Sequence, residues 1–439
     1  MQRNGGSLKS ARDEASAARH VNGIDLQDVS IAVFRLAGLA IRFGLTLFLV
    51  AFFSLHDVGS YALLVGITSM LPGSVGLGLS YFYNRRIVDA QDALLPVRDR
   101  LLISAAMSCF AAAVLVFLQE AGWFSLAIGS GSLIVLIVLE TLGFDLHLSL
   151  MARHRALIAN VLFFIRTAGW IPPFALIAYL NPEWRTLEAL VGAWLTGLGC
   201  WSVFFAAWGA RFLTASRLWH TRVDFALIRA TLPRAFPIWI SDISLAGGQV
   251  IDRFIVSIFL GLEATGIYYF FFAIANAAVT VGQAATQQVH MPVLRKAYLE
   301  NPSSAFVVIA QAHLKKAVIV VSILILSSVP ATYLVVALIA RPELTAHVVL
   351  IPIIAAAALF RSVAEYFGIF DYVTERDGSF VRFNIASVLA TSISVTVLTS
   401  LVGLMGTALG TLAVAFALSA VRFLVWRRTA RGLRQDTTR

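Results

Sequence analysis

Four arginines lie deep within apolar segments long enough to form membrane-spanning helices: Arg42, Arg166, Arg253 and Arg361. A charged side chain at the centre of a bilayer costs about 2.5–3.5 kcal/mol on insertion scales, so exposure of these groups to lipid is unfavourable. We therefore expect the four guanidinium groups to face other helices or an aqueous cavity. Cations in such a cavity would attract an anionic substrate.

Carboxylates accompany these cations in the same kind of segment. They are Glu140, Asp145, Asp242, Asp252 and Glu365, and we expect them to serve in ion coupling or charge pairing. Arg361 and Glu365 are four residues apart, within reach on one helix face, so they form either a self-neutralising pair or a functional one. Glu140 has two open interpretations: it carries a proton, or it pairs with Arg42 or Arg166.

Spacing suggests a polar stripe on one predicted helix. Asp242, Gln249 and Arg253 share a face of a continuous helix, whereas Asp252 and Arg253 point about 100° apart and need separate partners. Two further arginines, Arg35 and Arg422, lie near the predicted cytoplasmic ends of their segments. We expect these two to extend toward the membrane surface.

The sequence contains no motif of an enzyme or an ATP-driven pump. There is no Walker loop, no HExxH and no nucleophile elbow. The two cysteines, Cys109 and Cys200, supply neither a disulfide framework nor a metal site. We expect no catalytic residues, no metal and no cofactor.

Composition indicates a membrane protein. Of the 439 residues, 59% are hydrophobic and 13% are charged, and soluble domains carry about 25% charged residues. The net charge of +10 is better explained by basic cytoplasmic loops than by nucleic-acid binding. The fold class predicted is all-α and polytopic, with about 12 transmembrane helices in two six-helix lobes, of the exporter-like, alternating-access kind.

Apolar runs of about 20 residues mark the helices. In the first half they cover 30–53, 59–83, 101–118, 126–151, 156–180 and 187–208; in the second they cover 236–260, 264–289, 316–340, 346–372, 382–402 and 406–425. The domains predicted are a cytoplasmic N-terminal tail (1–29), a first six-helix lobe (30–208), a cytoplasmic link (209–235), a second six-helix lobe (236–426) and a basic cytoplasmic C-terminal tail (427–439).

Two patterns support this layout. Gly59-Ser60-Tyr61 and Gly266-Ile267-Tyr268 each follow an acidic turn at the same place in their half, which favours an internal repeat. Most of the 34 lysines and arginines fall in segments predicted to be cytoplasmic, and only Arg185 and Arg341 fall on the opposite side. By the positive-inside rule, both termini are expected in the cytoplasm.

These motifs resemble those of bacterial polysaccharide flippases. The Asp252-Arg253 helix, the Gly266-Ile267-Tyr268 turn and the segment Pro292-Val293-Leu294-Arg295 are similar to their seventh and eighth helices, and Gly59-Ser60-Tyr61 leading to Asn84-Arg85-Arg86 is similar to their first half. These flippases share a superfamily with multidrug exporters. The resemblance implies a central cavity that opens alternately to each side and an undecaprenyl-pyrophosphate-linked oligosaccharide as substrate.

The function expected is therefore an inner-membrane flippase that moves lipid-linked oligosaccharide repeat units to the periplasmic leaflet, for surface polysaccharide or exopolysaccharide such as O-antigen. Expected partners are membrane lipids, the undecaprenyl-linked oligosaccharide, and polysaccharide polymerase and chain-length proteins, but not nucleic acid. A multidrug or organic-cation exporter of the same superfamily is the first alternative, and its cavity would be ruled by carboxylates. A membrane-bound polysaccharide polymerase or ligase is the second, and would need a larger outer loop.

Overall fold

The computed structural model describes residues 26–89, 94–122, 126, 128–213, 223–300 and 304–435, and the described residues contain helices and no strand. Eleven of the helices are long and apolar enough to cross a membrane. Long apolar segments take this form because backbone amides and carbonyls in hydrocarbon must bond within their own helix. The chain is a multi-pass membrane protein.

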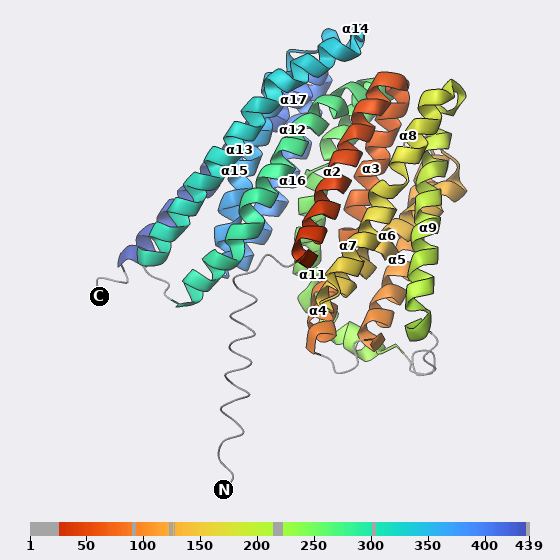
Figure 1. Ribbon diagram of the computed structural model, residues 1–439. Coiled ribbons are helices and arrows are strands. Elements are labelled where there is room, and N and C mark those ends of the chain that lie inside the picture. Colours follow the sequence, from red (N-terminus) through yellow and green to blue (C-terminus); the bar gives the residue numbers. More distant parts are fainter. Residues whose placement is uncertain are drawn as a thin grey trace.

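The first half of the chain forms one group of helices (Figure 1). They are α2 (Leu26–Phe52), α3 (Leu55–Val75), α4 (Leu79–Asp89), α5 (Leu94–Glu120), α6 (Ser130–Ala152), α7 (Ala156–Phe164), the π-helix η1 (Ile165–Gly169), α8 (Ile171–Leu180), the short η2 (Pro182–Trp184) and α9 (Leu187–Leu213). The segment α7–η1–α8 is one membrane span, Ala156–Leu180. Its π-turn precedes Pro172 and Pro173, whose missing N–H groups interrupt the α-helical hydrogen bonds.

The second half contains α11 (Phe225–Gly248), α12 (Ile251–Glu300), α13 (Ser304–Ile339), α14 (Pro342–Thr345), α15 (Leu350–Val373), α16 (Asp377–Val402) and α17 (Leu404–Gln435). The 50-residue α12 is two helices, because Gly261 has a φ of 84° and a ψ of 178°. This break falls at the turn that the sequence predicts. The eleven candidate spans among the described residues, one of them the bent α12, agree with the predicted all-α, polytopic fold class.

Several helices extend beyond their predicted ends. Helix α11 begins at Phe225, so most of the described part of the predicted link 209–235 is helical, and α17 continues into the predicted tail, to Gln435. Toward the N-terminus, α2 begins at Leu26, within the predicted tail 1–29. A helix can continue beyond the hydrocarbon region because its backbone groups still bond within the helix. Such charged ends are not detected from the length of an apolar run.

The predicted seventh helix is also not continuous. Residues Gln249 and Val250 separate α11 from α12, and their amides bond to Ala246 and Gly247, three residues back. Gly247 and Gly248 precede the break, where glycine weakens a helix. The predicted stripe from Asp242 through Gln249 to Arg253 is not one continuous face, because Asp242 and Gln249 are exposed whereas Arg253 is buried.

The two groups of helices meet most closely where α3 crosses α12. A Cβ atom placed on Gly59 would lie 1.9 Å from the Leu262 carbonyl oxygen, and one on Gly266 would lie 2.2 Å from the Leu55 carbonyl oxygen. The contact is reciprocal, and it joins the two glycines of the predicted repeat. Only glycine permits this approach of the two backbones.

Helix α11 makes a second connection between the halves. It packs against α16 of its own half and also against α3 and α4 of the first half. The Trp239 indole N–H donates to the Ser74 carbonyl at 2.5 Å, and Gly78, with a φ of 68°, lies against the Ala235 carbonyl. This helix therefore bridges the two groups near the lower end of the molecule in Figure 1.

Candidate functional site

The four deep arginines form two similar clusters, one in each half, and each cluster is built around a phenylalanine. In the first half, the guanidinium carbons of Arg42 and Arg166 lie 5.7 Å and 5.6 Å from the centre of the Phe163 ring. In the second, those of Arg253 and Arg361 lie 4.2 Å and 5.3 Å from the Phe272 ring. Aromatic faces attract cations at these distances.

In each cluster, one arginine is paired with a carboxylate. Arg166 Nη1 donates to Glu140 Oε2 at 2.6 Å and to the Glu140 carbonyl at 2.6 Å, and both side chains are buried. The Trp194 indole donates to the other carboxylate oxygen at 2.7 Å. Gly143 leaves room for this arrangement, since a Cβ there would lie 2.5 Å from Arg166 Cδ. Glu140 therefore pairs with Arg166 and not with Arg42, the other partner predicted for it.

Arg361 is the paired arginine of the second cluster. Its Nε lies 4.0 Å from Glu365 Oε1, one helical turn along α15, and its Nη2 donates to Asn276 Oδ1 at 2.7 Å. Glu365 also accepts a hydrogen bond from Gln283. This carboxylate offsets part of the charge of Arg361 and ties α15 to α12.

The other arginine of each cluster has no carboxylate partner among the described residues. Arg42 donates only to the Gly38 carbonyl of its own helix, at 3.2 Å. Arg253 is 5% exposed, its Nε has no hydrogen-bond acceptor in the described part of the chain, and its Nη2 reaches the Gln249 carbonyl at 3.4 Å. Each half thus contributes one guanidinium group that forms no ion pair within the described residues, and Glu140, which is bonded to Arg166, interacts with Arg42 only at longer range.

These two arginines approach the boundary between the halves. The Arg253 guanidinium lies 5.3 Å from the Tyr269 ring, and Arg42 interacts electrostatically with Tyr61 and Tyr269. The rings of Tyr61, on α3, and Tyr269, on α12, are 6.1 Å apart. Both cations therefore lie near an aromatic contact between the halves.

The remaining predicted acids lie outside these clusters. Asp145 is fully buried and accepts from Arg100 Nη2 at 2.6 Å and from Ser104. Asp252 accepts from the Tyr268 hydroxyl at 2.8 Å, and makes no ion pair with Arg253 in the described chain. Asp242 is exposed on α11 and has no ion pair or hydrogen bond among the described residues. No group of three metal-ligating side chains occurs in the described ranges.

Arg422 does not extend to the membrane surface, as the sequence suggests it should. It is buried, its Nη1 donates to the Ala364 carbonyl at 3.0 Å, and Gly368 makes room for it. Arg35 donates to Asn160 Oδ1 at 2.9 Å. Acceptors on neighbouring helices thus satisfy the buried Arg422, whereas Arg35 remains exposed although it bonds to Asn160.

Sequence reasoning missed the aromatic part of the site. Phe163, Tyr61, Trp194, Tyr269 and Phe272 surround the arginines, yet none is charged. The run Tyr268-Tyr269-Phe270-Phe271-Phe272 was the available signal, because five consecutive aromatic residues must direct some rings toward the interior of a bundle. A cavity of about 20 Å³ beside Phe272 and Arg361 also lies in this region.

Comparison with known proteins places the fold. No protein-family model and no curated protein sequence matches the chain. Solved structures do match. An inward-facing multidrug resistance MATE family transporter of the MOP superfamily aligns with a TM-score of 0.65 at 15% identity, over 94% of this chain and 96% of that one. The chain has the fold of the MATE transporters.

Two further solved structures share the fold. An outward-facing MATE family transporter aligns with a TM-score of 0.59 at 14% identity, over 92% of this chain and 95% of the other. A MOP superfamily transporter from Pyrococcus furiosus, described as having a binding pocket of reverse polarity that suggests a different function, aligns with a TM-score of 0.55 at 16% identity, over 92% and 95%. These proteins are transporters and not enzymes, and their fold agrees with the superfamily that the sequence resembles.

Proposed function

We propose that this chain is a membrane transporter that works by alternating access, and that it binds an anionic group of its substrate between the two halves, at Arg42 and Arg253. The observation that carries the proposal is a pair of cations, one from each half, that form no ion pair within the described residues: Arg253 is buried and Arg42 is partly buried. The MATE fold, known in inward-facing and outward-facing forms, supports the mechanism.

Electrostatics favours an anion at this position. A buried charge is costly unless it is paired or hydrogen-bonded, and the rings of Phe163, Phe272 and Tyr269 offset only part of that cost for Arg42 and Arg253. Arg166 and Arg361 already have Glu140 and Glu365. A phosphate or carboxylate group that reached the two unpaired arginines would supply the missing charge.

An undecaprenyl-pyrophosphate-linked oligosaccharide is the substrate that fits both this charge and the resemblance of the sequence motifs. Its pyrophosphate would contact the two arginines while the polyprenyl chain remains in the bilayer. In this proposal the protein lies in a bacterial inner membrane with both termini in the cytoplasm. Polymerase and chain-length proteins would then use the exported repeat units.

A multidrug exporter is the second candidate, and the solved structures favour it over the flippase, because two of the structures that match are described as multidrug resistance transporters. Its substrates would be organic cations, which need a carboxylate. Asp242 is the exposed carboxylate on α11 and would serve that role. The charge of the two arginine clusters argues against a cationic substrate. The comparisons do not fix the sign of the substrate's charge, since one of the aligned transporters is described as having a binding pocket of reverse polarity.

A deletion strain separates the candidates. We expect undecaprenyl-linked repeat units to accumulate, surface polysaccharide to fall at least tenfold, and drug susceptibility to stay unchanged. Complementation with Arg42→Ala or Arg253→Ala should fail although each protein inserts in normal amounts. Arg382→Ala, an exposed arginine bonded to its own helix at Gly378, is the matched control and should restore export.

Two results would overturn the proposal. Normal export by both arginine variants would show that Arg42 and Arg253 do not bind the substrate. Unchanged lipid-linked sugars together with raised drug susceptibility, and loss of drug resistance in Asp242→Asn, would establish the multidrug exporter instead.

A further inference from the structure

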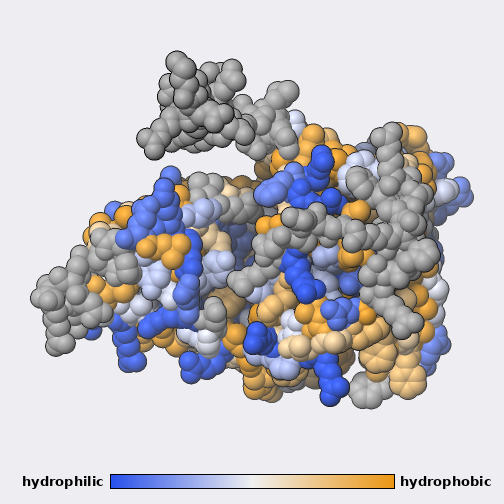
Figure 2. Space-filling model, turned by 90° about the horizontal axis from the view of Figure 1, so that it is seen from below, coloured by the Kyte–Doolittle hydropathy of each residue, from blue (hydrophilic) through white to orange (hydrophobic). Residues whose placement is uncertain are grey.

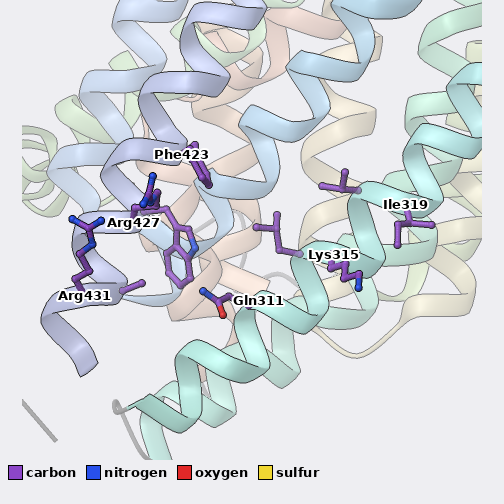
Figure 3. Close-up of a pocket in the computed structure, with 10 residues that line it drawn as sticks. Gln311, Lys315, Ile319, Phe423, Arg427 and Arg431 are labelled. Carbon is purple, nitrogen blue, oxygen red and sulfur yellow. The ribbon is translucent and has the colours of Figure 1, made fainter. Parts of the chain in front are cut away.

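A second cavity lies away from the arginine clusters, between α13 and α17. Its volume is about 590 Å³, and Gln311, Lys315 and Ile319 of α13 face Phe423, Arg427 and Arg431 of α17 across it (Figure 3). These residues belong to the basic end of the bundle, which the positive-inside rule places in the cytoplasm. Seen from below, hydrophilic side chains are spread over this end (Figure 2).

The charged residues that line the cavity are all basic. They are Lys315, Arg427 and Arg431, and all three are exposed. None has an ion pair or a hydrogen bond within the described residues, and the Arg427 guanidinium lies 5.6 Å from the Phe423 ring. No carboxylate lines the cavity, so its field attracts anions.

Apart from Gln311, the rest of the lining is apolar, and the apolar surface continues along the membrane-spanning part of α13. Trp426 is buried and stacks on Phe370 with ring centres 4.2 Å apart. Ile319 is 48% exposed, and Ile323 and Leu326, further along α13, are 61% and 63% exposed. A cationic cavity thus opens onto a hydrocarbon-facing surface.

We propose that this cavity binds an anionic phospholipid, with its phosphate at Lys315, Arg427 and Arg431 and an acyl chain along Ile319, Ile323 and Leu326. Basic pockets between membrane helices on the cytoplasmic side recognise such headgroups. A free phosphate would use the cations but leave the apolar surface without a partner, which favours the lipid. The site is separate from the transport site and does not depend on which substrate is carried.

The test uses the full-length chain reconstituted in nanodiscs that contain equal parts of phosphatidylglycerol and phosphatidylcholine. Native mass spectrometry counts the lipids that remain bound. The variant Lys315→Gln/Arg427→Gln removes two cavity cations, and Lys316→Gln/Arg428→Gln removes the neighbouring exposed cation on each helix, neither of which lines this cavity. Both variants change the net charge equally.

We expect the amount of bound phosphatidylglycerol to fall about tenfold in the cavity variant and to stay unchanged in the control variant. The reason is that each basic residue near an anionic lipid contributes measurably to its attraction. Retention of phosphatidylcholine should be the same in both. Equal loss in both variants would show attraction by surface charge alone and would overturn the proposal. Displacement of the lipid by millimolar inorganic phosphate would also overturn it, in favour of a site for the free ion.

Discussion

At the scale of single residues, we assign different roles to the two arginines of each cluster, one in stability and one in substrate binding. Arg166 and Arg361 have carboxylate partners, whereas Arg42 and Arg253 form no ion pair within the described residues. Breaking a buried ion pair leaves an uncompensated charge, whereas removing an unpaired cation does not. Substitutions should therefore separate a stabilising arginine from a binding one.

The first prediction concerns Glu140. Glu140→Ala leaves Arg166 buried without an anion and the Trp194 indole without its acceptor. We expect the free energy of unfolding to fall by about 3 kcal/mol or more, measured by denaturant or thermal unfolding in detergent. Arg42→Met, which breaks no ion pair, should change it by less than about 1 kcal/mol.

The double variant Glu140→Ala/Arg166→Met provides the internal control. Replacing both members of a buried pair by apolar groups is often close to neutral, so part of the lost stability should return. If Arg42→Met destabilises the protein as much as Glu140→Ala, the proposed division between paired and unpaired arginines is wrong.

The sequence predicts which charges are buried but not how they pair. Glu140 had two candidate arginines because a one-dimensional spacing cannot show which helix packs against α6. The choice depends on Gly143, whose missing side chain admits the Arg166 side chain. The same reason explains why Arg422 is buried. The missing side chain of Gly368 leaves room for its guanidinium group, and a hydrophobicity pattern does not show this.

At the scale of helices, the crossing of α3 and α12 is the closest approach of the two halves. Gly59→Ala would place a Cβ 1.9 Å from the Leu262 carbonyl oxygen, and Gly266→Ala would place one 2.2 Å from that of Leu55. Backbone atoms cannot yield as a side chain does, so the helices must separate. We expect each variant to destabilise this state by about 1–3 kcal/mol and to lower transport.

Gly44→Ala is the matched control for this second prediction, because nothing lies within 4 Å of a Cβ at that position of α2. In a helix, alanine is more favourable than glycine by about 0.5–1 kcal/mol, so its thermal midpoint should be equal or higher. Thermal unfolding in detergent compares all three variants. Normal stability and transport in Gly59→Ala and Gly266→Ala would contradict the tight crossing.

The sequence predicts where the membrane-spanning helices lie, but it does not predict every break within them. Apolar runs report which residues enter the bilayer, and they find the crossings together with the break at Gly261. They do not report the break at Gln249 and Val250, because the flanking residues are as apolar as those of a straight helix. Nor do they report α11 before residue 236, where arginines and prolines interrupt the run.

At the scale of the whole molecule, the two halves make matching contacts, in keeping with the predicted repeat. The glycines of the repeat face each other, and each half brings one phenylalanine with two arginines. An alternating-access transporter needs two bodies of this kind and a site between them. The sequence indicated the two bodies, but only the packing of α3 on α12 shows where they touch.

The last prediction follows from the charge of the proposed substrate. Moving two negative charges outward across a potential of 100 mV, inside negative, gains about 4.6 kcal/mol, at roughly 2.3 kcal/mol for each charge. In vesicles with an imposed potassium diffusion potential, the protein should translocate a fluorescent lipid-linked pyrophosphate faster when the destination side is positive, and slower when the potential is reversed. Arg42→Ala/Arg253→Ala vesicles should show neither effect, since the anion site is absent. A rate that ignores the potential would mean that a compensating cation travels with the substrate, and a rate that responds in the opposite sense would mean that the carried charge is positive, as a multidrug exporter requires.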